Sequence, residues 1–508
     1  MSTLLNLNQN NNDYTLSLKV CRRGIISCLV WFVIYGFFLI LLFHFSIQNT
    51  TRLLLLGSVF LVGLPFTLQY LCYGHINWFL PFNVFIAFFG LFWVSRSFYI
   101  AIKGYELFSI GGPPMSSAIS FNENFVWSLV GLMAFLIAYY FWSNYLRSSN
   151  SFIRFIPKPI NLSQMRNIRH VETIAYLSFI LILGIYTVYM TKIGGIINFI
   201  NNWNHLRFSA GSGRTTLWFT FFMLQPIVWV VSICYISKTR YRKSRVSLIG
   251  LILTTVTASI ILFTTGSRAS LILFWVGIMV IYHYIVKPIS FRKLAIIVGF
   301  LIVFAVSAGR LRHYLSSGTP FYRTGNGLVM KVLDYGLRDF TFVDLSYFYM
   351  SHVPEEHDYL WGRSLTDIPT FVIPRKIWAC KPLILGPSIV LRYFFPKFRP
   401  NTHISPSLLG DLYINFSYPG IIVGMALLGI FCQTVERNIK NLAEHPERTL
   451  IPICTIAFFF FLFKSGLFGG FVRISIIYIL PLFVLLNISK FIRFQKPQLL
   501  EDDTSQSA

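Results

Sequence analysis

The chain has 508 residues, of which 55% are hydrophobic and only 12% are charged, and it carries a formal net charge of +25. A soluble domain carries roughly 25% charged residues, so this composition excludes an ordinary soluble protein. The positive charge does not indicate nucleic-acid binding, because no nucleic-acid motif and no basic helix stands in a soluble segment. The sequence therefore predicts an integral membrane protein.

Twelve apolar segments of about 20 residues follow one another along the chain, each long enough to cross a bilayer. Each is expected to be a helix, because lipid offers no hydrogen-bonding partner to an exposed backbone. Two pairs of segments are separated only by short stretches, which predict tight hairpins at Gly266–Arg268 and Gly469–Arg473. The predicted helices are residues 24–46, 53–72, 78–95, 125–145, 173–192, 216–236, 247–265, 270–286, 294–309, 412–433, 450–468 and 474–490.

Basic residues gather in six places along the chain, and a count of twelve helices puts all six on one side of the membrane. Excess Lys and Arg in short loops marks the cytoplasmic side, so both termini are predicted to be cytoplasmic. The expected division is a cytoplasmic N-terminal tail (1–23), transmembrane helices 1–9 (24–309), a large, partly helical outer loop (310–411), transmembrane helices 10–12 (412–490) and a cytoplasmic C-terminal tail (491–508).

The outer loop 310–411 is the only interval large enough to hold a site outside the bilayer. It mixes arginine and lysine residues with aromatic residues, among them Trp361 and Trp378. This mixture suits a substrate that is anionic at one end and ring-shaped along its length, such as a phosphate-linked sugar. Trp378 is the candidate for stacking on a sugar ring.

Basic residues from sequence-distant loops are predicted to converge on the outer face. Positive charge is normally kept out of short outer loops, so Arg268 and Arg473 stand out most. Guanidinium groups suit a pyrophosphate, because their planar fork makes paired charge-assisted hydrogen bonds. The alternative for each arginine is an interfacial side chain that reaches lipid phosphate or ends a helix. The candidate pyrophosphate-binding residues are Arg207, Arg214, Arg268, Arg375, Lys381 and Arg473.

Two motifs in and after this loop carry a family resemblance. Residues Ile373–Pro382 resemble the Pro-Arg-x-x-Trp-Pro-x-Lys-Pro motif of bacterial O-antigen and exopolysaccharide repeat-unit polymerases, the Wzy class. Residues Ser407–Ser417 resemble the family's Ser-x-x-Gly-Glu-x-Tyr-x-Asn-Phe-Gly entry into the next helix. The Gly266–Arg268 hairpin and the glycine-containing run from Arg207 to Arg214 resemble two further family loops. The chain departs from the family pattern at three positions, which are Ala379, Asp411 and Ser417.

The resemblance implies an all-α polytopic glycosyltransferase of the GT-C type, with about twelve helices, in the inner (cytoplasmic) membrane of a bacterium. Its large loop would then be periplasmic. The donor would be a polyprenyl-pyrophosphate-linked oligosaccharide and the acceptor a second lipid-linked repeat unit, with release of polyprenyl pyrophosphate. The expected partners are therefore these lipid-linked glycans, the lipid bilayer and a chain-length-regulating membrane protein.

This reaction breaks an anomeric C–O bond and expels a pyrophosphate, so preorganised cations stabilise its transition state. No metal or cofactor is then required. The acceptor hydroxyl needs a general base or a loose, cation-assisted transition state. His403 and Asp411 are the candidate catalytic bases, because both lie near the second motif. The alternatives are a structural loop histidine and an acidic residue at a helix N-terminus.

Three other functions remain open at this point. An O-antigen ligase uses the same donor but a different acceptor. A flippase or transporter of lipid-linked oligosaccharides usually has two related halves and charges at mid-depth in the membrane, and Lys464 is the one candidate for such a charge. A membrane scaffold without catalytic activity is the third, and the convergence of cations disfavours it.

Overall fold

The computed structural model describes ten segments of the chain, together with parts of residues 26–42 and residues 198, 303, 307, 368, 378 and 487. Every regular element in these residues is a helix, and nine helices are long and apolar enough to cross a membrane. The described residues therefore form a polytopic helical membrane protein, as the sequence predicts. The ten segments are 47–102, 118–148, 168–195, 220–239, 245–265, 267–301, 340–355, 358–366, 406–439 and 446–485.

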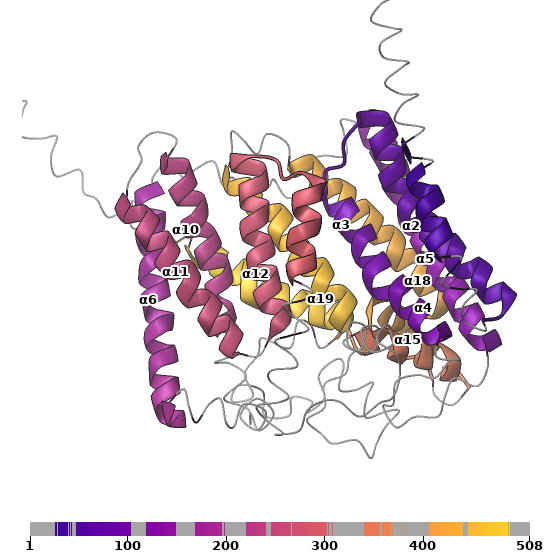
Figure 1. Ribbon diagram of the computed structural model, residues 1–508. Helices are drawn as coiled ribbons and strands as arrows, with labels where there is room; N and C mark the ends of the chain where they lie inside the picture. The colour runs from indigo at the N-terminus through magenta and orange to yellow at the C-terminus, as the bar shows by residue number, and fades with distance from the viewer. Residues whose placement is uncertain are drawn as a thin grey trace, which may run out of the picture. The chain divides into compact units, whose positions relative to one another are not determined.

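The described residues form two compact units that interleave along the sequence. Unit 1 takes its residues from Met1–Ser149, Val329–Glu436 and Phe459–Gly470. Unit 2 takes its residues from Asn150–Leu328, Arg437–Phe458 and Phe471–Ala508. Each unit is built from long apolar helices, and Figure 1 shows the helices of each unit in the colours of their chain position.

Capping residues set the ends of helices in unit 1. α2 ends at Gly74, which takes φ 75° and donates its N–H to Tyr70, a helix ending that suits glycine. α3 begins with Pro81, and Glu436 accepts the N–H of Phe82 at 2.9 Å near this helix N-terminus. The elements of unit 1 are α2 (Asn49–Tyr73), α3 (Pro81–Phe88), η1 (Phe89–Val94), α4 (Ser95–Ile102), α5 (Ala118–Ser148), α15 (Thr341–His352) and most of α18 (Leu408–Asn438).

Unit 2 is a group of helices in which α6, α10 and α11 pack side by side (Figure 1). The hairpin predicted between α11 and α12 is confirmed: α11 ends at Thr264, α12 begins at Arg268, and Ser267 accepts the N–H of Ser270 as an N-cap. The elements of unit 2 are α6 (Ile168–Ile193), α10 (Leu224–Thr239), α11 (Arg245–Thr264), α12 (Arg268–Ile281), η4 (Tyr282–Val286), η6 (Pro446–Thr449) and η7 (Ile474–Ile479), and α19 (Leu450–Arg473) contributes residues to both units.

α18 is two helical arms that fold back on each other. The helix breaks at Phe416 (φ −140°, ψ 17°) and Ser417 (φ 60°, ψ −160°). A Cβ on Gly424 would lie 2.4 Å from the side chain of Leu412, although 12 residues would separate them by about 18 Å in a straight helix. Every residue of the short arm 408–415 is buried. The sequence predicted that a membrane span begins at residue 412, but residues 412–415 belong to this short arm.

α19 also reverses its direction, at Gly466 (φ 66°, ψ −169°). Two contacts establish the reversal: a Cβ on Gly470 would lie 3.2 Å from the Cα of Leu462, and the rings of Phe458 and Phe471 are 5.2 Å apart. The two predicted helices are therefore present, but the turn between them was misplaced. Residues 469–473 are helical. Gly470 has no side chain, and this lets the second arm pack closely against Leu462 of the first arm.

The described part of the predicted outer loop includes a helix that is integrated into unit 1. Residues 342–350 of α15 are all buried. Asp344 of this helix makes a paired hydrogen bond to Arg96 of α4, with Nε–Oδ1 and Nη2–Oδ2 distances of 2.7 and 2.6 Å. Both side chains are at most 1% exposed, so the ion pair fixes α15 against a membrane helix.

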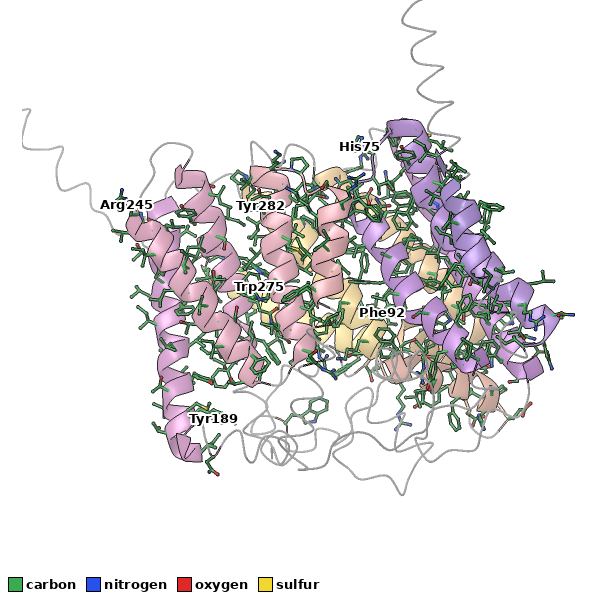
Figure 2. The ribbon with its side chains drawn as sticks, in the orientation of Figure 1. His75, Phe92, Tyr189, Arg245, Trp275 and Tyr282 are labelled. Carbon is green, nitrogen blue, oxygen red and sulfur yellow. The ribbon has the colours of Figure 1, made fainter. Side chains whose placement is uncertain are left out.

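The predicted orientation leads to a test with reporter fusions. We expect a reporter fused after Lys243 to be cytoplasmic and one fused within loop 310–411 to be extracytoplasmic, because the basic clusters share one parity. In unit 2, Figure 2 shows Arg245 and Tyr282 at one end of their helices and Tyr189 at the opposite end, as alternating helix directions require. A reporter fused after Lys243 that proved to be extracytoplasmic would contradict the predicted orientation.

Candidate functional site

The clearest polar site in the described part of unit 1 lies where the short arm of α18 contacts the turn of α19. We call it the Asp411 junction and define it by Ser364, Asp411, Asn415, Gly466 and Leu467. Asp411, Asn415 and Ser364 are at most 4% exposed. Buried polar groups are costly unless they are hydrogen-bonded, so the contacts of these residues show what the junction does.

Both carboxylate oxygens of Asp411 accept hydrogen bonds. Oδ2 accepts the N–H of Leu467 at 2.8 Å. Leu467 is the first residue after the turn of α19. Oδ1 accepts from the Ser364 hydroxyl at 3.3 Å and from the Asn415 amide at 3.1 Å. A carboxylate at a helix N-terminus satisfies backbone N–H groups and the positive end of the helix dipole. Asp411 therefore caps the second arm of α19 from a different helix.

Gly466 makes this cap possible. Its φ of 66° with ψ of −169° belongs to a backbone region that is essentially restricted to glycine. A Cβ at this position would lie 2.7 Å from Oδ2 of Asp411 and 3.0 Å from the carbonyl oxygen of Pro406. The carboxylate can approach the turn only because residue 466 has no side chain.

Asn415 connects the short arm of α18 to the segment 358–366 of the predicted outer loop. Its Oδ1 accepts the N–H of Gly362 at 3.1 Å and, at 3.0 Å, shares the single hydroxyl proton of Ser364 with Oδ1 of Asp411. Its amide donates to the carbonyl oxygen of Asp411 at 2.7 Å. The backbone adds a further bond between the two elements, from Leu360 N–H to the carbonyl oxygen of Ile414 at 2.8 Å. The loop segment is thus held at a fixed position on the buried arm.

A third element, α15, reaches the same arm at Gly410. A Cβ on Gly410 would lie 2.6–2.9 Å from atoms of Ser346, so the two helices approach at a distance that only glycine allows. The hydroxyls of Ser346 and Ser407 are 2.8 Å apart, and Ser407 N–H donates to Ser346 at 3.2 Å. Tyr349 of α15 is also close to Asp411, and burial together with this carboxylate raises the pKa of Tyr349 well above its usual value. The phenol therefore stays protonated at working pH.

These contacts favour a structural task for Asp411. A general base must present an open oxygen to the acceptor hydroxyl. The carboxylate of Asp411 is 4% exposed, and its two oxygens already accept three hydrogen bonds. The short arm, the loop segment and α19 meet on this one side chain, so it holds these three elements of unit 1 together.

The two described arginine candidates lie in unit 2. Arg268 is the first residue of α12 and is half-buried. Arg473 lies seven residues after the Gly466 turn, inside a helix rather than in the predicted hairpin loop. It is followed by the π-helix η7, in which residues five apart lie on one face, and it interacts electrostatically with Tyr478. Tyr478 donates to Gln225 Oε1 at 3.0 Å.

The remaining predicted site residues divide into two groups. Trp378, the predicted sugar-stacking residue, is half-buried and lies outside the regular elements. The others lie outside the residues that the structure describes, and they are Arg207, Arg214, Arg375, Lys381 and His403.

Some residues of the junction were not predicted from the sequence. Asn415 belongs to the second motif, but its role as a link to the loop becomes clear only from its contacts. Gly466 is one of three closely spaced glycines, and a positive φ leaves no mark on the sequence. The pairing of Arg96 with Asp344 joins residues 248 positions apart, so only the folded chain brings it into view.

Comparisons of the chain with protein-family models, with curated proteins and with solved structures found no match.

Proposed function

We propose that the protein is a glycosyltransferase that polymerises polyprenyl-pyrophosphate-linked oligosaccharide repeat units at the outer face of a bacterial inner membrane. The growing glycan is transferred from its pyrophosphate carrier to a hydroxyl of a second lipid-linked repeat unit. One observation carries the proposal furthest: the Ser407–Ser417 motif that resembles the polymerase family contains the buried arm 408–415, on which a loop segment and the turn of α19 are fixed.

The proposed chemistry requires cations that are held in position. Negative charge develops on the departing pyrophosphate, and cations stabilise it best when they are already in place. Arg268 and Arg473 both belong to helices and lie in unit 2, and a helical backbone suits this task. The tail of the donor is an isoprenoid, so a protein that is itself embedded in the bilayer can receive it without extracting it from lipid.

The described residues favour a polymerase over a transporter. Lys464, the candidate for a charge at mid-depth, is exposed and lies two residues before the Gly466 turn. Two of the buried charged residues, Arg96 and Asp344, neutralise each other in an ion pair. Alternating access instead requires charged or polar groups at a site in the middle of the membrane.

The decisive experiment supplies purified protein in proteoliposomes with lipid-linked repeat units. A polymerase makes a ladder of products that differ by one repeat unit and releases polyprenyl pyrophosphate. A ligase makes a single transfer product, and only when a lipid A–core acceptor is present. A flippase moves the lipid-linked unit across the bilayer and forms no new glycosidic bond. The ladder is the expected result, and either of the other outcomes contradicts the proposal.

Arg268 gives a first test of the pyrophosphate-binding residues. Charge-assisted hydrogen bonds contribute about 1.5–3 kcal/mol each, so Arg268→Ala is expected to slow polymerisation tenfold or more. Arg268→Lys should restore only part of the rate, because the paired geometry of the guanidinium is lost. The rate is measured as released polyprenyl pyrophosphate per folded protein.

Arg245 provides the matched control for this test. It is an exposed arginine at the first position of α11, and Figure 2 shows it at the upper end of that helix. Arg245→Ala is expected to leave the rate unchanged. If both Arg268 variants polymerise normally, Arg268 is an interfacial anchor and takes no part in the reaction.

A further inference from the structure

Trp361 combines two features that a packing role does not explain. Its side chain is 72% exposed, and its backbone has φ 47°. Among the described residues, Trp361 and Ser417 are the only non-glycine residues with positive φ. For a bulky residue this conformation is strained. Because the ring is exposed, its burial contributes little free energy to offset this backbone strain. Strain of this kind persists mainly at functional sites.

The structure forces this conformation from both sides of Trp361. The N–H of Leu360 donates to the carbonyl oxygen of Ile414 at 2.8 Å, and the N–H of Gly362 donates to Oδ1 of Asn415 at 3.1 Å. Both acceptors belong to the buried short arm of α18. The residues before and after Trp361 are therefore tied to a rigid support, and the ring between them is presented outwards.

The immediate surroundings of the ring are polar and aromatic. Tyr359 contacts Trp361 edge-on, with ring centroids 5.7 Å apart. The hydroxyl of Ser417, the second strained residue, donates to the hydroxyl of Tyr359 at 2.9 Å. Asp358 and Arg363 are exposed on the same short segment. An exposed aromatic ring, on one segment with hydroxyl, carboxylate and guanidinium groups, matches a sugar ring, which has an apolar C–H face and a rim of hydroxyls.

We propose that Trp361 is a stacking platform for a sugar ring of the glycan substrate, with Tyr359, Asp358 and Arg363 available to its hydroxyls. The identity of the substrate rests on the proposed polymerase function. An anchor in the lipid interface would also be an exposed tryptophan, but it needs no strained backbone and no fixed segment. Trp361 is distinct from Trp378, the residue singled out by the sequence motif.

Trp361→Gly separates a binding role from a structural role. Glycine adopts positive φ without strain, so the melting temperature of the variant is expected to equal or exceed that of the wild type. Its affinity for the glycan should fall about tenfold or more, because the stacking ring is lost. Trp361→Phe keeps an aromatic face and should retain most of the affinity.

The probe is the repeat-unit oligosaccharide, released from its lipid carrier by mild acid and titrated calorimetrically into protein in nanodiscs. The control is Trp275→Ala. Trp275 is an exposed tryptophan about midway along α12 (Figure 2). Alanine is used there rather than glycine, because glycine would destabilise the helix. It is expected to bind the oligosaccharide like the wild type.

The outcomes distinguish this inference from the proposed function. Unchanged affinity of Trp361→Gly overturns the platform, and so does a fall of several degrees in its melting temperature. If the wild type forms a product ladder but Trp361→Gly binds normally, the polymerase stands and the platform fails. If no ladder forms but the oligosaccharide binds through Trp361, the platform stands and the polymerase fails.

Discussion

Gly466→Ala is expected to lower the free energy of unfolding by about 3 kcal/mol or more. The backbone region that Gly466 occupies costs a residue with a side chain about 1–3 kcal/mol. The new methyl group would also lie 2.7 Å from Oδ2 of Asp411, so the carboxylate would have to move away from the N–H of Leu467. A buried N–H without its acceptor costs a further 1–3 kcal/mol, roughly. The turn of α19 and its cap are therefore lost together.

The measurement is thermal or denaturant unfolding of the purified protein in a mild detergent. Gly57→Ala is the matched control, because Gly57 lies inside α2 of the same unit and a Cβ there meets no atom within 4 Å. Alanine is a better helix former than glycine, so this control should be as stable as the wild type or slightly more stable. A Gly466→Ala protein with wild-type stability would show that the reversal does not depend on this residue.

The sequence predicted the membrane helices well because their signal is the length of an apolar run. Seven predicted spans, from 53–72 to 270–286, correspond to long helices among the described residues. The last two predicted helices are also present, the first as the arm of α19 before Gly466 and the second as the helix that continues from the other arm through η7. The position of the turn between them could not be predicted, because Gly466, Gly469 and Gly470 lie in one apolar run and the sequence pattern does not distinguish them. Their different backbone angles and packing partners decide which one forms the turn.

The short arm of α18 shows a second limit of sequence reasoning. Residues 408–415 continue into the apolar run that follows, so hydropathy gives no reason to separate them. Their polar members Asp411 and Asn415 find partners in a loop and in another helix, which no periodic pattern reveals. Both residues lie in the second motif, which therefore located the polar part of this arm. Whether Asp411 takes part in chemistry or in support depends on contacts that only the fold supplies.

Trp361 was visible in the sequence only as one aromatic residue among several in the outer loop. The sequence instead favours Trp378, because it lies within the motif Ile373–Pro382. Positive φ and 72% exposure are properties of the folded chain, and together they separate Trp361 from aromatic residues that simply pack. Segment 358–366 is therefore the part of the loop from which the structure adds most to the functional hypothesis.

His403→Ala is expected to lower turnover by roughly 10²–10⁴-fold while leaving donor binding close to that of the wild type. A general base acts on the acceptor hydroxyl in the transition state, so its loss changes the rate and not the ground-state affinity. An unperturbed imidazole has a pKa of about 6.5, which keeps a large fraction in the base form at neutral pH. Turnover and donor binding are measured separately on the folded, monodisperse fraction.

Asp411→Asn is the comparison that distinguishes a base from a cap. The amide keeps one oxygen for the N–H of Leu467 but turns a donor towards the Asn415 amide, which is itself a donor. We therefore expect lower stability, with turnover per folded molecule reduced far less than in His403→Ala. A folded Asp411→Asn protein that binds donor but turns over 10²-fold more slowly, roughly, would make Asp411 the base. Normal turnover in both variants would reject a general base and leave cation-assisted departure of pyrophosphate as the dominant chemistry.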